Sequence, residues 1–259
     1  MGFVYRLCSA LRLANGKLRP KTAAVVLAGG VGARMQAETG ETKQLLSVCG
    51  IPVVVRSLLA FEKSPYIDEI VLVVRKEETE RVKALLAEYG IKKVSKIVLG
   101  GQTRQESAEN GFNAISSSMK FVAIHDAARC LITVEMIAKV VSAAYAHRAA
   151  SAGAPVSDTV KEIDKNGYVV NTPDRAFLFA AQTPQVFSAS LYRVAVETAK
   201  REGFTATDDN MLVERLGQAV KMINCGEENI KITTRKDLIL VEALLIAREE
   251  AVKKKRQKP

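Results

Sequence analysis

A cluster of glycines near the start of the chain has the composition of a phosphate-binding loop. Gly29, Gly30 and Gly32 follow the apolar segment 23–28, and Arg34 comes two residues after the last of them. Glycine lets the backbone turn sharply and approach a ligand. Consecutive main-chain amides form a concave anion site, and arginine presents a planar fork of donors to phosphate oxygens. A flexible turn that binds nothing is the alternative, and both interpretations fit this stretch alone.

The loop does not match two common nucleotide-binding templates. It lacks the Gly-Lys-Ser/Thr ending of a P-loop, and Met35 stands where the third glycine of a dinucleotide-binding fingerprint would fall. A nucleotide bound here must therefore be held in a different way.

The chain is strongly basic, which favours an anionic partner. It has 259 residues and a formal net charge of +10, with basic residues concentrated in segments 1–22 and 249–259. Proteins that bind single-stranded nucleic acid interleave basic and aromatic residues, but aromatic residues make up only 5% here and tryptophan is absent. We therefore expect phosphorylated small molecules as partners and no nucleic acid. Segment 1–22 is interpreted as a basic extension, with an organelle transit peptide as the alternative, and 249–259 as a basic tail.

The cysteines indicate the compartment. Cys8, Cys49, Cys130 and Cys225 are far apart and form no C-x-x-C pair, so they suggest neither a zinc site nor a disulfide framework. Isolated cysteines are typical of a reducing cytoplasm. No apolar run reaches the ~18 residues of a membrane span, so we expect a cytoplasmic protein with no membrane partner.

Short apolar runs alternate with segments of helical periodicity in the first half of the chain. The sequence predicts strands at 23–27, 68–74, 94–99 and 121–124, and helices at 52–63, 76–89, 104–116 and 133–148. This alternation is typical of βαβ units and predicts an α/β fold with a doubly wound, mostly parallel sheet. Ligands bind beyond the carboxyl ends of the strands in such sheets. The loops expected to carry the site are 29–34, 100–107 and 126–129.

The pattern changes after residue 150. Short strands are predicted at 152–156, 159–163 and 168–172, and Asn166-Gly167 predicts a hairpin turn because this pair suits positive φ. We expect a protruding β-arm at about 155–182 within a single domain, 23–248. A two-stranded arm is marginally stable alone, so we expect it to pack on a second copy in a homodimer, with packing on its own domain as the alternative. The remaining predictions are helices at 188–202, 208–216 and 235–250 and a strand at 219–224.

Several further segments carry polar and charged residues in a recognisable order. With the loop Leu27–Met35 and Lys43-Gln44, they are Gly100–Ser107, His125–Arg129, Asp158–Lys161, Asp174-Arg175, Gln182–Gln185 and Asn229–Thr233. Together they resemble the sugar-phosphate nucleotidyltransferases and, more narrowly, the 2-C-methyl-D-erythritol 4-phosphate cytidylyltransferase family. The resemblance covers roughly residues 23 to 246 and implies a Rossmann-like nucleotidyltransferase fold.

The resemblance also implies an activity. It is the transfer of a cytidylyl group from CTP to 2-C-methyl-D-erythritol 4-phosphate, with release of pyrophosphate, in the non-mevalonate isoprenoid precursor pathway. One alternative is a ribitol 5-phosphate cytidylyltransferase, and another is a non-catalytic binding protein on the same scaffold. The segment His125–Arg129 favours the first reading, because the ribitol enzymes tend to have a bulkier residue at the Ala128 position.

The resemblance implies roles for individual residues. Because both reactants are anionic, catalysis is expected to depend on positioning and preorganised positive charge, which the family assigns to Arg34, Lys43, Arg175 and Lys231. Nucleotide contacts are expected from Ala28, Gly29, Gly30, Gly32, Gly101, Gln102, Ser107, Asp126 and Ala127. Polyol-phosphate contacts are expected from Arg129, Thr159, Arg175 and Thr183. Asp126 is also the expected ligand of Mg²⁺, since a carboxylate with phosphate oxygens is a normal environment for that ion.

Gln102 and Cys130 depart from the pattern of the family. Gln102 stands where the family commonly has an acidic residue, so a backbone role is expected there instead of a side-chain role. Cys130 replaces a common proline. His125 is interpreted as structural, because a phosphate nucleophile is already ionised and needs no general base.

Overall fold

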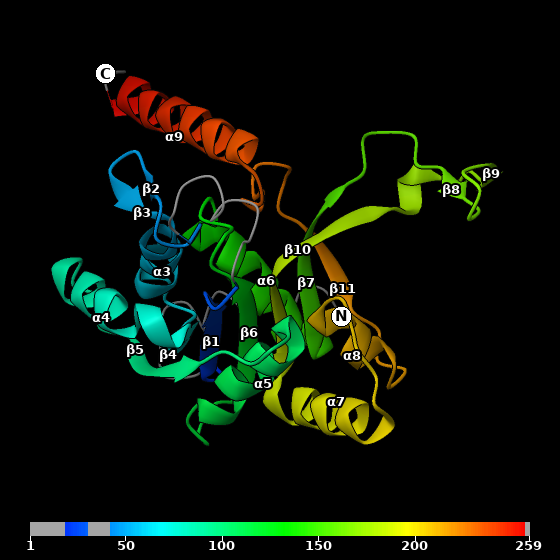
Figure 1. Cartoon of the computed structure of the whole chain (residues 1–259), viewed down its shortest axis with the longest axis horizontal. Helices are drawn as coiled ribbons and strands as arrows, with labels where there is room; N and C mark the ends of the chain where they lie inside the picture. The colour runs from blue at the N-terminus through cyan, green and yellow to red at the C-terminus, as the bar shows by residue number, and fades with distance from the viewer. Residues whose placement is uncertain (1–18, 31–41, 257–259) are drawn as a thin grey trace.

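The computed structural model describes residues 19–30 and 42–256 (Figure 1). Gly32 and Arg34 lie outside the described residues, as does most of the basic extension 1–22. The described chain is built around a seven-stranded sheet with the order β11-β7-β10-β6-β1-β4-β5. Its strands are β1 (Thr22–Leu27), β4 (Glu69–Val74), β5 (Val94–Leu99), β6 (Phe121–Asp126), β7 (Ala149–Pro155), β10 (Phe179–Ser188) and β11 (Lys221–Asn224).

The centre of the sheet is parallel. β1 pairs in parallel with β4 and β6, and β5 continues in parallel beyond β4. β10 is antiparallel to both β6 and β7, whereas β11 is parallel to β7. The predicted doubly wound, mostly parallel sheet is therefore confirmed. Leu27 and Asp126 are register partners at the carboxyl ends of β1 and β6, so the loops after these strands leave from the same edge.

Helices cover both faces of the sheet (Figure 1). One face carries α5 (Arg104–Ala114), α7 (Ala189–Glu202) and the short α8 (Asp209–Glu214). The other carries α3 (Val53–Lys63), α4 (Thr79–Glu88), which follows the 3-10 turn η1 (Lys76–Glu78), and α6 (Val134–His147). None of the helices in the described residues is both long and apolar enough to cross a membrane.

β1 is buried on both faces. Ala24 and Val26 belong to the apolar cluster under α3 and α6, whereas Val25 and Leu27 belong to the cluster under α5 and α7. Successive side chains of a strand point to opposite faces, so a fully apolar strand serves two cores. Gly111 lets α5 lie close to the sheet, because a Cβ there would lie 2.3 Å from Cγ1 of Val25.

Threonine side chains cap two helices that begin near the sheet edge. The Thr103 hydroxyl accepts a hydrogen bond from the Glu106 amide at 3.0 Å, at the start of α5. The Thr133 hydroxyl accepts one from the Met136 amide at 3.2 Å, at the start of α6. Each cap satisfies an otherwise unpaired amide of the first helical turn.

The structure differs from the sequence predictions at several points. A small hairpin of β2 (Ser47–Val48) and β3 (Ile51–Pro52) precedes α3 and was not predicted. The last helix, α9 (Arg235–Arg256), extends well past residue 250, so most of the predicted tail 249–259 is helical. The alanine, glutamate, lysine and arginine residues of this segment are strong helix formers, which explains the longer helix. Asp126 is the last residue of β6 and does not follow the strand.

The predicted β-arm projects from the sheet (Figure 1). Its tip is the hairpin of β8 (Glu162–Ile163) and β9 (Val169–Asn171), and the 3-10 turn η2 (Arg175–Phe177) leads back to β10. Gly167 takes a φ of 87° in the hairpin turn, as its Asn-Gly sequence predicted. Large apolar side chains of the arm are exposed, including Tyr168 at 72% and Phe177 at 85%. The arm does not bury these side chains on its own domain.

Candidate active site

Two adjoining pockets open at the edge of the sheet where β1 and β6 end. The first pocket is lined by Leu27, Gly29, Gly30, Lys43, Gln44, Gly101, Gln102, Thr103, Arg104, Ser107, Asp126, Ala128 and Lys231. The second pocket is lined by Arg104, Asp126, Arg129, Ala181, Gln182, Thr183, Gln185, Thr207, Asp208 and Lys231. Arg104, Asp126 and Lys231 line both, so they stand at the junction of the two pockets.

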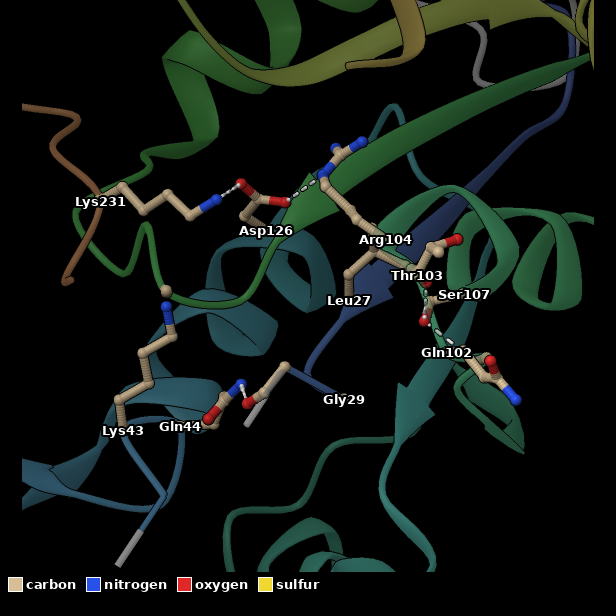
Figure 2. Close-up of a pocket in the computed structure, with 13 residues that line it drawn as sticks. Leu27, Gly29, Lys43, Gln44, Gln102, Thr103, Arg104, Ser107, Asp126 and Lys231 are labelled. Carbon is tan, nitrogen blue, oxygen red and sulfur yellow. Dashed lines mark hydrogen bonds and ion pairs between the residues drawn. The ribbon is translucent and has the colours of Figure 1, made fainter. Parts of the chain in front are cut away.

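Asp126 lies between two cations at this junction (Figure 2). Its Oδ2 lies 2.7 Å from Nζ of Lys231, and its Oδ1 accepts a hydrogen bond from Nε of Arg104 at 3.1 Å. Burial alone would raise the pKa of the Asp126 carboxyl, but the charges of Arg104 and Lys231 outweigh burial and bring this pKa well below its usual range. The carboxylate is therefore ionised throughout the neutral range.

Arg104 also pairs with a second carboxylate. Its Nη1 donates to Oδ2 of Asp209 at 2.7 Å, and Tyr192 donates its hydroxyl hydrogen to Oδ1 of the same carboxylate at 2.6 Å. Asp209 is 1% exposed. Burial lowers the pKa of the Arg104 guanidinium, but the charges of Asp209 and Asp126 more than compensate, so the net shift is upward.

Local contacts on both sides position Lys43. Its Nζ donates to the carbonyl of Ile232 at 3.1 Å, which places it beside the segment that carries Lys231. On one side the Thr42 hydroxyl donates to the buried carboxylate of Glu78. On the other, the Gln44 side chain donates to the carbonyl of Gly30 at 2.7 Å. These bonds connect the lysine to the glycine loop and to the end of η1.

The segment that carries Lys231 is held against the sheet edge. The Ile232 amide donates to the Ala128 carbonyl at 2.9 Å. The fully buried Asn229 side chain donates to the Thr183 carbonyl at 2.9 Å. Residues 229–233 therefore lie beside the loop after β6, although a long stretch of chain separates the two.

The loop between β5 and α5 uses its own amides. The Gly101 amide donates to Oγ of Ser107 at 3.0 Å, and the Gln102 amide donates to Oε2 of Glu106 at 2.7 Å. The Ser107 hydroxyl in turn donates to the Thr103 carbonyl at 2.9 Å. The Gln102 side chain points away from the pocket (Figure 2). A base bound here would meet the carbonyl oxygens of this loop or would have to replace one of these bonds.

Thr183 and His125 form a hydrogen-bonded chain with the main chain of Asp126. The Asp126 amide donates to Oγ1 of Thr183 at 3.0 Å, and the same oxygen lies 3.0 Å from Nδ1 of His125. Burial lowers the pKa of the His125 imidazole to about 3, so this ring is neutral at physiological pH. A neutral, fully buried histidine fits the structural role expected for it.

Arg129 reaches the second pocket from the loop after β6. Its Nη1 donates to the Asn229 carbonyl at 2.8 Å, and its Nη2 donates to the Ala181 carbonyl at 3.4 Å. Within the described part of the chain, its Nε is buried and has no hydrogen-bond partner. Burial lowers the pKa of its guanidinium, and the nearby charge of Asp126 partly offsets this effect.

Four expected site residues do not line the two pockets. Ala28 and Ala127 are buried behind the surface, where the Ala28 amide donates to the Val73 carbonyl and the Ala127 amide donates to the Leu27 carbonyl. Their places in the first pocket are taken by their neighbours, Leu27 and Ala128. Thr159 and Arg175 are exposed on the arm, and Arg175 donates to the Ser157 carbonyl at 2.7 Å.

Sequence reasoning missed Arg104 and Asp209 as site residues. Arg104 is the first residue of α5, where the helix dipole disfavours a cation. A cation at such a position suggests a nearby carboxylate partner, so the sequence did contain a signal for Arg104. For Asp209 the sequence contained no signal except its place at the start of a helix, because its partner Arg104 lies 105 residues away.

The donor set around Asp126 fits one kind of metal ion. Among the described residues, no group of three or more histidine, cysteine, aspartate or glutamate side chains could hold a metal. In the part of the chain that the structure describes, each oxygen of Asp126 accepts from one cation, and a carboxylate oxygen has a second lone pair to offer. Asp126 can therefore contribute one ligand to an ion that takes its others from bound phosphates and water, which is how Mg²⁺ is usually held.

Comparisons of sequence identify relatives over almost the whole domain. A family model described as 2-C-methyl-D-erythritol 4-phosphate cytidylyltransferase matches residues 22–247. A protein of that name from Caldanaerobacter subterraneus is 43% identical over 223 residues, which is 86% of this chain and 97% of the relative. Another from Geobacillus kaustophilus is 44% identical over 226 residues, which is 87% of this chain and 97% of the relative.

Solved structures agree with the sequence comparisons. The crystal structure of 4-diphosphocytidyl-2C-methyl-D-erythritol synthase from Anaerococcus prevotii superposes with a TM-score of 0.78 at 31% identity, covering 87% of this chain and 96% of that one. The 2-C-methyl-D-erythritol 4-phosphate cytidylyltransferase from Thermus thermophilus superposes with a TM-score of 0.69 at 30% identity, covering 85% of this chain and 97% of that one.

Proposed function

This chain belongs to the 2-C-methyl-D-erythritol 4-phosphate cytidylyltransferase family, and we propose that the two pockets at its sheet edge carry out that family's reaction. The chain transfers a cytidylyl group from CTP to 2-C-methyl-D-erythritol 4-phosphate in isoprenoid precursor synthesis. An oxygen of the substrate phosphate forms a bond to the α-phosphorus of CTP. The bond from that phosphorus to the oxygen bridging to the β-phosphate breaks, and pyrophosphate leaves. This assignment replaces the ribitol phosphate and non-catalytic alternatives.

One observation carries the placement of the reaction: Lys43 and Lys231, from distant parts of the chain, line the pocket that ends at Asp126. The reaction brings two anions together and adds negative charge around phosphorus as the new bond forms. Preorganised cations stabilise that charge more than they stabilise the separate substrates. Lys43 and Lys231 are therefore the proposed catalytic cations, together with Arg34 and Arg175.

The first pocket is the proposed CTP site. Gly29 and Gly30 allow the triphosphate to approach the main chain, and Lys43 lines the same pocket. Cytosine presents an exocyclic amino group as a donor, and the carbonyl oxygens of the loop around Gly101 and Gln102 are acceptors for it. The amides of that loop are hydrogen-bonded to Ser107 and Glu106. These bonds fix the conformation of the loop and therefore the positions of its carbonyl acceptors.

The second pocket is the proposed site for the polyol phosphate. Arg129 lines this pocket and offers the positive charge of its guanidinium to the phosphate. Thr207 and Asp208 also line this pocket. Because the two pockets share Asp126 and Lys231, a phosphate in the second lies next to the α-phosphate in the first, which is the proximity that the reaction needs.

Mg²⁺ is the proposed cofactor, with Asp126 as its ligand among the described residues. When bound, the ion neutralises phosphate charge and orients the triphosphate. Asp126 is suited to hold it because its carboxylate stays ionised between Arg104 and Lys231. Lys231 contributes a second positive charge at the same place.

We also propose that the enzyme is a homodimer formed through the β-arm. Thr159 and Arg175 lie on the arm, outside both pockets of their own chain, and the arm exposes Tyr168 and Phe177. An arm that packs on a second copy would bury these apolar side chains. It would also carry Arg175 toward the partner's pockets. A cytoplasmic location is proposed from the free cysteines Cys49, Cys130 and Cys225.

Pyrophosphate release tests the proposed function directly. The protein is incubated with CTP, Mg²⁺ and either 2-C-methyl-D-erythritol 4-phosphate or ribitol 5-phosphate, and pyrophosphate is measured over time. We expect release with the first substrate, and much slower release when ATP, GTP or UTP replaces CTP. Release only with ribitol 5-phosphate would overturn the substrate, and release with neither would overturn the reaction.

A further inference from the structure

Asp209 is a buried carboxylate that lies outside the lining of both pockets. Asp209 begins α8, and both of its carboxylate oxygens are engaged: Oδ1 by the Tyr192 hydroxyl at 2.6 Å and Oδ2 by Nη1 of Arg104 at 2.7 Å. A buried charge is costly unless it is paired and hydrogen-bonded. Asp209 has both, because Arg104 supplies the opposite charge and Tyr192 supplies a further hydrogen bond.

The main chain around Asp209 is fixed as well. The amides of Asp209 and Asn210 donate to Oε1 of Gln185, at 2.9 Å and 3.2 Å. The Nε2 of Gln185 donates to Oδ2 of Asp208 at 2.8 Å. Asp208 is the residue that caps α8. Gln185 is 1% exposed and belongs to β10. The start of α8 is thus hydrogen-bonded to the sheet.

Arg104 joins this fixed point to the junction of the pockets. One edge of its guanidinium meets Asp209 and another meets Oδ1 of Asp126 at 3.1 Å. A planar guanidinium holds two carboxylates at a set spacing and angle, which a lysine ammonium cannot do. With Oδ1 occupied in this way, Oδ2 of Asp126 faces Lys231 (Figure 2).

We propose that Asp209 is a positioning residue for cytidylyl transfer, which acts through Arg104 to set the orientation of the Asp126 carboxylate. The inference rests on the proposed function of the pockets. Asp209 touches no substrate in this scheme. It fixes the rotation of Arg104, and Arg104 determines which oxygen of Asp126 is presented to Lys231 and to a phosphate-bound Mg²⁺.

Asp209→Asn is the principal test, because it removes the charge and keeps the size of the side chain. We expect kcat to fall by about 10- to 100-fold, the size of loss that follows from a small misplacement of reacting groups. We also expect the Mg²⁺ concentration for half-maximal rate to rise several-fold, with a smaller change in the KM for CTP. Glu214→Gln, at an exposed residue of the same helix, is the matched control and should change none of these values.

A double-mutant cycle tests whether Asp209 acts through Arg104. Arg104→Lys keeps a positive charge but cannot bridge two carboxylates, so it should lower kcat on its own. If the two residues act as one unit, the Asp209→Asn/Arg104→Lys double variant is no slower than the slower single variant. Losses in kcat that multiply would show that the residues act independently, and would overturn the proposal.

Thermal unfolding separates positioning from stability. A variant of Asp209 that unfolds at a lower temperature but keeps the wild-type kcat and Mg²⁺ dependence would overturn the proposal. If Asp209→Asn does not fold, Tyr192→Phe decides the question, because it removes one hydrogen bond to Asp209 and keeps the aromatic packing. A folded Tyr192→Phe protein is expected to show the same changes to a smaller degree, and wild-type behaviour would also overturn the proposal. Absence of pyrophosphate release by the wild-type protein is a separate result, which concerns the reaction itself.

Discussion

The main-chain amide of Asp126 donates to the hydroxyl oxygen of Thr183 at 3.0 Å, so a residue expected to hold substrate also holds the main chain of the carboxylate. Thr183 is 4% exposed, and its oxygen also lies against Nδ1 of His125. Since burial keeps that imidazole neutral, the threonine hydroxyl can donate to the ring while it accepts from the amide. Its hydrogen-bonding capacity is therefore used mainly inside the protein.

Replacing this hydroxyl should reduce stability. Thr183→Val keeps the shape but leaves the Asp126 amide unpaired, which should lower the free energy of unfolding by about 1–3 kcal/mol. Thr183→Ser retains the oxygen and should come much closer to wild type. Chemical denaturation measures both. Unchanged stability in Thr183→Val would mean that the hydroxyl serves substrate alone.

The two lysines of the first pocket should be needed for turnover. Lys43→Ala and Lys231→Ala are each expected to lower kcat by ~10²-fold or more, the cost of losing one donor that stabilises charge in a transition state. Lys236→Ala, at an exposed residue near the start of α9, controls for the loss of a surface charge. Near-normal rates in both pocket variants would contradict the proposed roles of these lysines.

The loop around Gly101 should tolerate a change at Gln102 but not at Gly101. A Cβ at Gly101 would lie 2.3 Å from Cβ of Glu106, so Gly101→Ala must shift the loop and should raise the KM for CTP by roughly tenfold or more, about 1.4 kcal/mol of binding. Gln102→Ala should leave this KM nearly unchanged, because its side chain points away from the pocket. Steady-state kinetics with varied CTP measure both values, and a larger effect at Gln102 would refute a backbone role.

The β-arm should control assembly. Tyr168→Ser with Phe177→Ser removes two exposed apolar side chains of the arm and should shift the sedimentation coefficient from dimer toward monomer. Ile239→Ser, at a residue of α9 that is 63% exposed, is the control and should leave the dimer intact. A wild-type protein that sediments as a monomer with full activity would exclude the dimer.

A mixing experiment tests whether a partner supplies Arg175. If each active site combines Lys43 of one chain with Arg175 of the other, then the Lys43→Ala and Arg175→Ala proteins are inactive alone. Random exchange of subunits should restore about a quarter of wild-type activity, because half the dimers would be mixed and each has one complete site. No recovery after exchange would place Arg175 in its own chain's site or outside the mechanism.

Cys130 should resist alkylation in the folded protein. Burial raises the pKa of its thiol from 9.0 to about 11. Since the thiolate is the reactive form, Cys130 should hold ~10²-fold less of it near pH 8.5 than an unshifted thiol would. Treatment with iodoacetamide followed by peptide mass spectrometry should show early modification at Cys49, which is exposed. Cys130 should be modified only as pH approaches 11 or after denaturation, and rapid labelling at pH 8.5 would mean that the packing around it is open.

Much of the fold was predictable because its signals are local. The apolar run of β1, the Thr133 cap and the Asn166-Gly167 turn each depend on residues close together in the sequence, and the structure contains all three. The motif order placed Lys43, Asp126 and Lys231 at one site, and all three line the first pocket.

The partners of those residues depend on tertiary structure. Arg104 meets Asp209 across 105 residues, and no local pattern encodes a contact formed by packing two helices against one sheet. Packing likewise buried Ala28 and Ala127, and it committed the Gly101 amide and the Thr183 hydroxyl to bonds within the protein. The sequence by itself determined most of the strands and helices and the candidate residues of the site. Only the tertiary structure decided which of their polar groups face a ligand, because a buried polar group must first be paired within the fold.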